Sequence, residues 1–149
     1  MGMPALQYHT AEWVRALPAD GNRYETVHGE LLVTLAPRMV HQQVVHRLQV
    51  ELELYLRREP VGVVLPSPAD ISWGPDSLVQ PDIFVAATDE MRSGDWALVK
   101  TLLLVIEVLS PSTARADRFA KRRLYQEVGV PLYWIVDAEK EPFDDSKYK

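Results

Sequence analysis

The sequence contains no cysteine and no long apolar segment, and each absence excludes a class of protein. Without cysteine it has neither disulfides nor zinc sites built on thiolates, so only histidine and carboxylate side chains remain as protein metal ligands. The longest nearly apolar run, Leu102 to Leu109, is far shorter than the roughly 20 residues that a membrane-spanning helix requires. We therefore expect no membrane span.

Basic residues are also in the minority. Sixteen Lys and Arg stand against 21 Asp and Glu, a formal net charge of −5, which argues against coating nucleic acid by bulk electrostatics but allows a local basic surface. Residues Met1 to Pro4 lack the features of a secretory signal, so we expect a cytoplasmic protein. Because no repeat or flexible linker divides the 149 residues, we predict one domain over residues 1–149.

The first half of the chain predicts a helix, a β-hairpin, a long helix and several strands. Thr10 is suited to cap a short helix, and Gly29 supplies the positive φ of a turn between strands at residues 24–27 and 30–35. The strongest periodic signal is helical and runs from Arg38 to Arg58, where Pro60 follows. Strand-like segments come next, at residues 61–65, 69–73 and 79–87.

The second half predicts a strand, a helix and a parallel strand. Residues 102–109 are rich in leucine, valine and isoleucine, as in a buried central strand. Residues 114–128 have the pattern of a helix that ends at Gly129, and residues 132–136 form the last strand. The final strand-helix-strand unit is expected to be a right-handed crossover, so the fold class is α/β or α+β.

Asp82 and Glu107, on two of these strands, form the clearest candidate site. A carboxylate within an apolar strand costs free energy unless it is paired or bound to a metal. If the two strands are antiparallel neighbours without an offset, opposed residue numbers sum to 189 and Asp82 faces Glu107. The same face would carry two further opposed pairs, Phe84 with Val105 and Ala86 with Leu103.

Two neighbouring carboxylates are what Mg²⁺ takes from a protein, together with waters and phosphate oxygens. Structural roles are the alternatives: Asp82 as the residue that starts a strand after Pro81, and Glu107 as the partner of a nearby arginine. Both alternatives stay open at this stage.

Lys121 is a third candidate because of its place on the predicted helix. It begins a stripe with Leu124, Tyr125 and Val128 that is expected to pack on the sheet. There its ammonium group would position a water and stabilise charge on a scissile phosphate. The alternatives are a side chain that extends to solvent or pairs with Asp117.

These motifs resemble the bacterial putative restriction endonuclease family of the PD-(D/E)xK nuclease superfamily. The similarity extends from about Thr10 to Asp137. It is carried by Gln80-Pro81-Asp82, by Ile106-Glu107-Val108-Leu109-Ser110-Pro111-Ser112-Thr113, by residues 117–125 and by residues 129–137. The resemblance implies a restriction-endonuclease-like mixed sheet with an αβββαβ core and an N-terminal hairpin. It also implies a Mg²⁺-dependent endonuclease, with Mn²⁺ as a possible substitute, that hydrolyses phosphodiester bonds of DNA.

By the same resemblance, Asp82 and Glu107 correspond to the metal-binding pair of the superfamily. Leu109 stands where the superfamily has lysine, and Lys121 matches a lysine that this family takes from the following helix. Six further residues are weaker candidates, each with a structural alternative: Glu30, His41 and Gln80 as supporting site residues, and Arg115, Arg118 and Arg122 as phosphate contacts.

Two departures from the family pattern motivate further hypotheses. The displaced lysine and the acidic charge favour, as the alternative, a weak or inactive nuclease fold that serves as a nucleic-acid-binding or protein-binding regulatory module. Residues 138–149 are polar and unlike the strand expected there. A sheet edge left free by a missing strand would pair with another chain, so we predict a homodimer or higher homo-oligomer.

Overall fold

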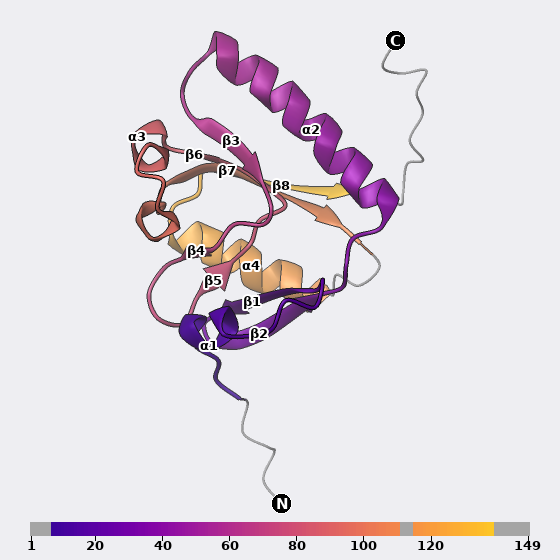
Figure 1. Cartoon of the computed structure of the whole chain (residues 1–149), viewed down its shortest axis with the longest axis vertical. Coiled ribbons are helices and arrows are strands. Elements are labelled where there is room, and N and C mark those ends of the chain that lie inside the picture. The colour runs from indigo at the N-terminus through magenta and orange to yellow at the C-terminus, as the bar shows by residue number, and fades with distance from the viewer. Residues whose placement is uncertain (1–6, 111–114, 139–149) are drawn as a thin grey trace, which may run out of the picture.

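The computed structural model describes residues 7–110 and 115–138, which form two four-stranded sheets with helices around them (Figure 1). One sheet has the strand order β2-β1-β5-β4, and the other has the order β3-β6-β7-β8. The elements are α1 (Ala11–Arg15), β1 (Arg23–Val27), β2 (Glu30–Thr34), α2 (Met39–Arg58), β3 (Val63–Pro66), β4 (Ile71–Ser72), β5 (Leu78–Val79), β6 (Ile83–Ala86), α3 (Thr88–Met91), the 3₁₀ helix η1 (Trp96–Leu98), β7 (Leu102–Leu109), α4 (Arg115–Glu127) and β8 (Leu132–Asp137). The order α2, β3, β6, β7, α4, β8 is the predicted αβββαβ core.

The N-terminal helix and hairpin form as the local sequence predicts. The Thr10 hydroxyl accepts a hydrogen bond from the backbone N–H of Trp13 at 3.1 Å and caps α1. His28 and Gly29 have φ values of 49° and 84°, so both central residues of the hairpin turn adopt the positive φ that such a turn requires. The two strands that flank this turn, β1 and β2, pair antiparallel with each other.

The long helix predicted over residues 38–58 is confirmed as α2, with Arg38 as its N-cap residue. Its apolar stripe packs on one face of the second sheet, where it covers β3, β6 and β7 (Figure 1). Within the described ranges, no helix is both long enough and apolar enough to cross a membrane. The inward-facing side chains of α2, such as Val44 and Leu48, belong to the core on this face of the sheet.

The predicted central strand is confirmed as β7, which pairs antiparallel with β6 and parallel with β8. The register Ile83↔Ile106, Phe84↔Val105 and Val85↔Leu104 follows the predicted sum of 189. A bulge follows, so Ala86 opposes Leu102 and the predicted pair of Ala86 with Leu103 is wrong. Leu103 is the extra residue of the bulge, and its side chain packs toward α2 instead.

The single strand predicted over residues 79–87 is divided into two strands, and this prediction is also wrong. Gln80, Pro81 and Asp82 separate β5 from β6, and the two strands belong to different sheets. Pro81 has no backbone N–H and cannot continue a hydrogen-bonded ladder. Asp82 consequently lies at the junction of the two sheets, immediately before β6.

The second sheet is covered on both faces at its central strands β6 and β7. On one face, α2 packs on the side chains of Ile83, Val85 and Ile106. On the other face, Phe84 and Val105 pack with α4 and with residues of the first sheet. Asp82 and Glu107 follow the side-chain alternation of Phe84 and Val105, so they point toward α4 and the hairpin.

Candidate active site

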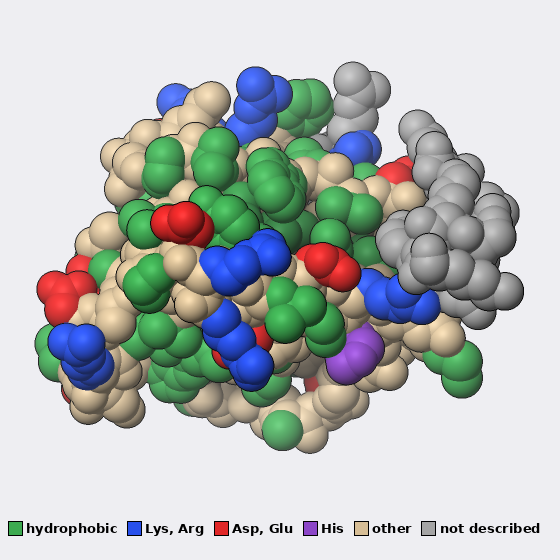
Figure 2. Space-filling model, turned by 90° about the horizontal axis from the view of Figure 1, so that it is seen from above, with side chains coloured by type: hydrophobic (Ala, Val, Ile, Leu, Met, Phe, Trp, Pro, Cys, Tyr) green, Lys and Arg blue, Asp and Glu red, His purple; other side chains and the backbone are tan. Residues whose placement is uncertain are grey.

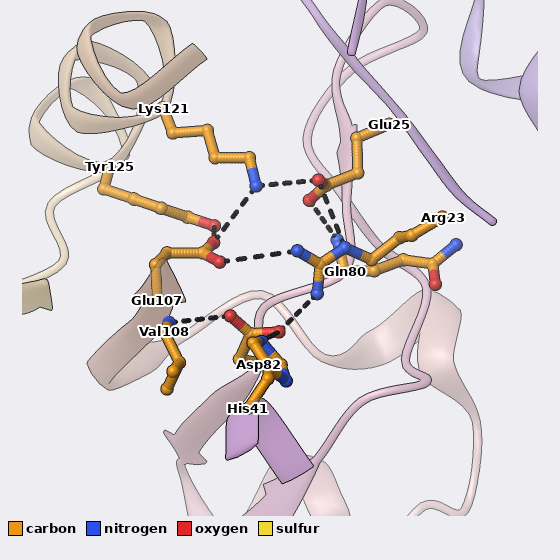
Figure 3. A network of polar contacts seen from close by, with 9 residues as sticks. All are labelled: Arg23, Glu25, His41, Gln80, Asp82, Glu107, Val108, Lys121 and Tyr125. Atoms are coloured by element: carbon orange, nitrogen blue, oxygen red, sulfur yellow. Dashed lines mark hydrogen bonds and ion pairs between the residues drawn. The ribbon is translucent and has the colours of Figure 1, made fainter. Parts of the chain in front are cut away.

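Three carboxylates and two cations meet where the two sheets approach α4 (Figure 3). The carboxylates belong to Glu25 of β1, Asp82 before β6 and Glu107 of β7, whose exposed fractions are 0%, 2% and 5%. The cations are Arg23 of β1 and Lys121 of α4, the latter 5% exposed. Burying such charges costs free energy unless they are paired, so the contacts within this network decide whether it is stable.

Asp82 is held from three directions. Its Oδ2 accepts a hydrogen bond from the backbone N–H of Val108 at 2.7 Å, and its Oδ1 lies 2.6 Å from Nη1 of Arg23 and 3.4 Å from Nε2 of His41. Burial would raise the pKa of Asp82, but the hydrogen bond to His41 and the charge of Arg23 outweigh it and hold the pKa well below its usual range. Asp82 is therefore ionised at neutral pH.

Glu107 is less well compensated. Its Oε1 lies 3.3 Å from both Nζ of Lys121 and the hydroxyl of Tyr125, and its Oε2 is 3.9 Å from Nη2 of Arg23. Burial raises the pKa of Glu107 to about 7; the charge of Lys121 lowers it only in part, and the charge of Asp82 raises it further. Glu107 is thus the carboxylate of the network that takes up a proton most readily.

Lys121 points into the network, as its place on the predicted stripe indicates. Leu124 and Tyr125 are buried beside it, and Val128 packs on the same core. Its Nζ lies 2.7 Å from Oε1 of Glu25, so the alternative of a side chain extended to solvent is contradicted. Burial lowers the pKa of Lys121, but the charges of Glu107 and Glu25 raise it above the ordinary value. Lys121 is therefore a permanently charged ammonium group.

Glu25 and Arg23 are the network residues that sequence reasoning missed. Glu25 accepts a hydrogen bond from the backbone N–H of Gln80 at 2.8 Å through Oε2, and it holds Lys121 through Oε1. The signal was present in the hairpin: side chains alternate along a strand, so Arg23 and Glu25 share the inward face of Val27. Which charged residue on that face is buried depends on the packing of the hairpin on α4.

A cleft of about 700 Å³ opens over Asp82, between the hairpin and α2. Helix α2 lines it with the side chains of His41, Gln42, His46 and Gln49. Arg23 borders the cleft too, and within the described part of the chain it is the one lysine or arginine that does so. The cleft wall is therefore mostly uncharged, and it also contains apolar side chains such as Leu35 and Val45.

A much smaller cavity lies behind the cleft, beside Glu107 and Lys121. Its volume of about 10 Å³ is close to the space that one water molecule needs. Arg118 and Tyr133 also line it, and the Arg118 Nε and the Tyr133 hydroxyl are both buried without a hydrogen-bond partner among the described residues. An oxygen atom in this cavity would lie next to these two donors.

The weaker candidates differ in where the structure places them. His41 and Gln80 border the cleft beside Asp82. Glu30 is exposed at the turn end of the hairpin, away from the network. The hairpin carboxylate that joins the network is Glu25 and not the predicted Glu30. Arg118 borders the small cavity, and Arg122 is exposed beside a separate depression near the β8 edge. The side chain of Arg115 and the predicted capping residues Ser112 and Thr113 lie outside the described residues.

The donor set fits a divalent cation in chemistry and in charge. With Glu107 ionised, three carboxylates face two cations, which leaves one excess negative charge, and carboxylate oxygens are the ligands that Mg²⁺ prefers. Among the residues that the structure describes, however, no three acidic or histidine side chains surround a common point. Arg23 and Lys121 lie between the carboxylates instead. A metal would be held by Asp82 and Glu107, the pair predicted from the sequence.

The sequence profile of a family described as "Putative restriction endonuclease" matches residues 10–144. This chain belongs to that family. A solved structure of a putative nuclease belonging to DUF820, from Anabaena variabilis ATCC 29413, is similar to it with a TM-score of 0.72 and 17% sequence identity, covering 86% of this chain and 73% of that chain. The likeness confirms the predicted restriction-endonuclease-like fold of the family member. A search of curated proteins found no match.

Proposed function

We propose that this family member is a Mg²⁺-dependent endonuclease that hydrolyses phosphodiester bonds of DNA, with Mn²⁺ as a substitute metal. The observation that carries the proposal is the meeting of Asp82 and Glu107, from neighbouring strands, with the buried ammonium group of Lys121. The family description and the name of the similar nuclease support the same reaction class. In this proposal Asp82 and Glu107 hold the metal, and Lys121 assists the reaction.

A bound Mg²⁺ supplies Lewis-acid polarisation of the phosphate and lowers the pKa of an attacking water. Asp82 contributes a carboxylate that is already ionised at neutral pH. Lys121 stays protonated because Glu25 and Glu107 raise its pKa, so it acts as a fixed positive charge and not as a general base. Such a charge stabilises the negative charge that develops on the phosphate as the bond breaks. Glu25 orients the Lys121 ammonium through their 2.7 Å contact.

Substrate binding is expected to rest on a few local contacts. On the face shown in Figure 2, Lys and Arg side chains lie among acidic and hydrophobic ones and form no large basic surface. The mostly uncharged cleft over Asp82 agrees with this pattern. Arg118, which borders the small cavity beside Glu107, is the predicted phosphate contact nearest the network. The dependence of DNA affinity on salt should accordingly be shallow, because few counterions are released.

A second candidate function is a regulatory module that binds nucleic acid or protein without cleaving it. One observation favours it: Asp82 and Glu107 already have cationic partners within the chain, so the pair is partly neutralised without a metal. A nuclease fold does not by itself guarantee turnover. The two candidates differ in whether the purified protein cleaves DNA in the presence of a metal.

The test is a cleavage assay on plasmid DNA with Mg²⁺ or Mn²⁺, with EDTA as the metal-free control. We expect metal-dependent cleavage by the wild type and a loss on the order of 100-fold or more in Asp82→Asn, as found when one electrostatic group of an active site is removed. Asp89→Asn, an exposed aspartate on α3, is the matched control and should cleave normally. Unchanged cleavage by Asp82→Asn would overturn the site, and DNA binding without cleavage would favour the second candidate.

A further inference from the structure

Arg23 is the cation that touches all three carboxylates of the network. Its guanidinium group lies 2.6 Å from Oδ1 of Asp82, 3.5 Å from Oε1 of Glu25 and 3.9 Å from Oε2 of Glu107 (Figure 3). Two different nitrogens of the same planar group face Asp82 and Glu107. The guanidinium of Arg23 therefore lies between the two carboxylates assigned to the metal.

The two cations of the network are held in different ways. Lys121 is 5% exposed, emerges from α4 behind the carboxylates and contacts Glu25 at 2.7 Å. The Arg23 side chain is 15% exposed and borders the 700 Å³ cleft, together with Asp82. Its backbone is fixed by pairing with Thr34 at the open end of the hairpin. Arg23 can thus turn its guanidinium into the cleft without any movement of the sheet, whereas Lys121 has no such exit.

A divalent cation that bridges Oδ1 of Asp82 and Oε2 of Glu107 would lie where the guanidinium now lies. These are the two oxygens that the guanidinium of Arg23 faces, since Oδ2 of Asp82 accepts the Val108 hydrogen bond and Oε1 of Glu107 faces Lys121 and Tyr125. The two positive charges would repel each other strongly in this buried place, since little water separates them. Binding of a metal and the present position of Arg23 exclude each other.

We propose that Arg23 is a built-in counter-ion of the metal site, which neutralises Asp82 and Glu107 in the metal-free protein and is displaced into the cleft when a divalent cation binds. This inference rests on the proposed function in one respect, the assignment of the two carboxylates to the metal. Arg23 would thereby lower the affinity of the site for a metal, because the metal ion must first displace the guanidinium group. Without Arg23, Asp82 and Glu107 would bind the same metal ion more tightly. Lys121 stays in place and keeps its contact with Glu25.

The experiment is calorimetric titration of the full chain with Mn²⁺ alone, without DNA, for the wild type and for Arg23→Gln. Glutamine removes the competing charge and is too short to bridge the two carboxylates. We expect Arg23→Gln to bind Mn²⁺ at least about tenfold more tightly, a change of about 1.4 kcal/mol. Arg57→Gln, at an exposed arginine of α2, is the matched control and should bind like the wild type.

Thermal unfolding gives a second readout that needs no activity. Without metal, Arg23→Gln should melt below the wild type, because its buried carboxylates lose a partner. Mn²⁺ should raise the melting temperature of Arg23→Gln by more than it raises that of the wild type. If Arg23→Gln does not fold, Arg23→Lys replaces it. Lysine keeps the charge but loses the planar fork that faces both carboxylates, so Arg23→Lys should bind Mn²⁺ more tightly than the wild type does, and equal or weaker binding would overturn the inference.

The outcomes separate this inference from the proposed function. If the wild type and Arg23→Gln bind Mn²⁺ equally, or the variant binds more weakly, Arg23 does not compete with the metal and the inference fails, while the metal site stands. If neither protein binds Mn²⁺, both the inference and the metal-dependent function fail. Tighter binding in Arg23→Gln together with an unchanged Arg57→Gln supports the counter-ion.

Discussion

Replacing Lys121 by methionine tests whether the buried network depends on internal charge balance. The change removes the ammonium group that lies 2.7 Å from Glu25 and 3.3 Å from Glu107, and it keeps a side chain of similar length. Breaking a buried pair by removing one partner typically costs about 3–5 kcal/mol, because the other charge is left uncompensated. For a chain of 149 residues, at about 2–4 °C per kcal/mol, the melting temperature should fall by roughly 6–20 °C.

The assay is urea denaturation followed by circular dichroism. Arg123→Met is the matched control, because Arg123 pairs with Glu127 on the surface and is 81% exposed, and such a pair contributes at most about 1 kcal/mol. Adding Glu25→Gln to Lys121→Met removes one of the two stranded carboxylates, so the double variant should regain about 1 kcal/mol or more over Lys121→Met. A loss below about 1 kcal/mol in Lys121→Met, or simple additivity in the double variant, would refute the charge-balance reasoning.

Two further predictions concern pH and the hairpin turn. The folded-state pKa of Glu107 is raised from 4.5 to about 7, so its contribution to the free energy of unfolding is fully present below pH 4.5 and is lost as the pH rises through 7. Glu107→Gln should therefore flatten the metal-free stability profile between these pH values, and an unchanged slope in urea titrations would contradict the assignment. Gly29→Ala should lower the free energy of unfolding by about 1–2 kcal/mol or more. The reason is that φ of this residue is 84° and the added Cβ would lie 2.3 Å from the Tyr8 ring. A Gly29→Ala variant with the thermal stability of the wild type would contradict this prediction.

The sequence determined those features that depend on neighbours along the chain. Helical spacing predicted α2 and the inward stripe of α4 that carries Lys121, and the glycine at position 29 predicted the hairpin turn, where it adopts a positive φ. The register of β6 and β7 was also predictable at Phe84 and Val105. A slip of one residue would have placed Phe84 and Val105, and with them Asp82 and Glu107, on opposite faces of the sheet.

Only the tertiary structure decided which charged side chains meet. Glu25 and Glu30 are both acidic residues of the hairpin, but the packing of the hairpin on α4 buries Glu25 and leaves Glu30 exposed at the turn. The position of Arg23 between Asp82 and Glu107 follows from the same packing. These contacts join residues far apart in the sequence, such as Arg23 and Asp82 or Glu25 and Lys121. Local periodicity carries no information about such distances, so they arise only when the two sheets and α4 come together.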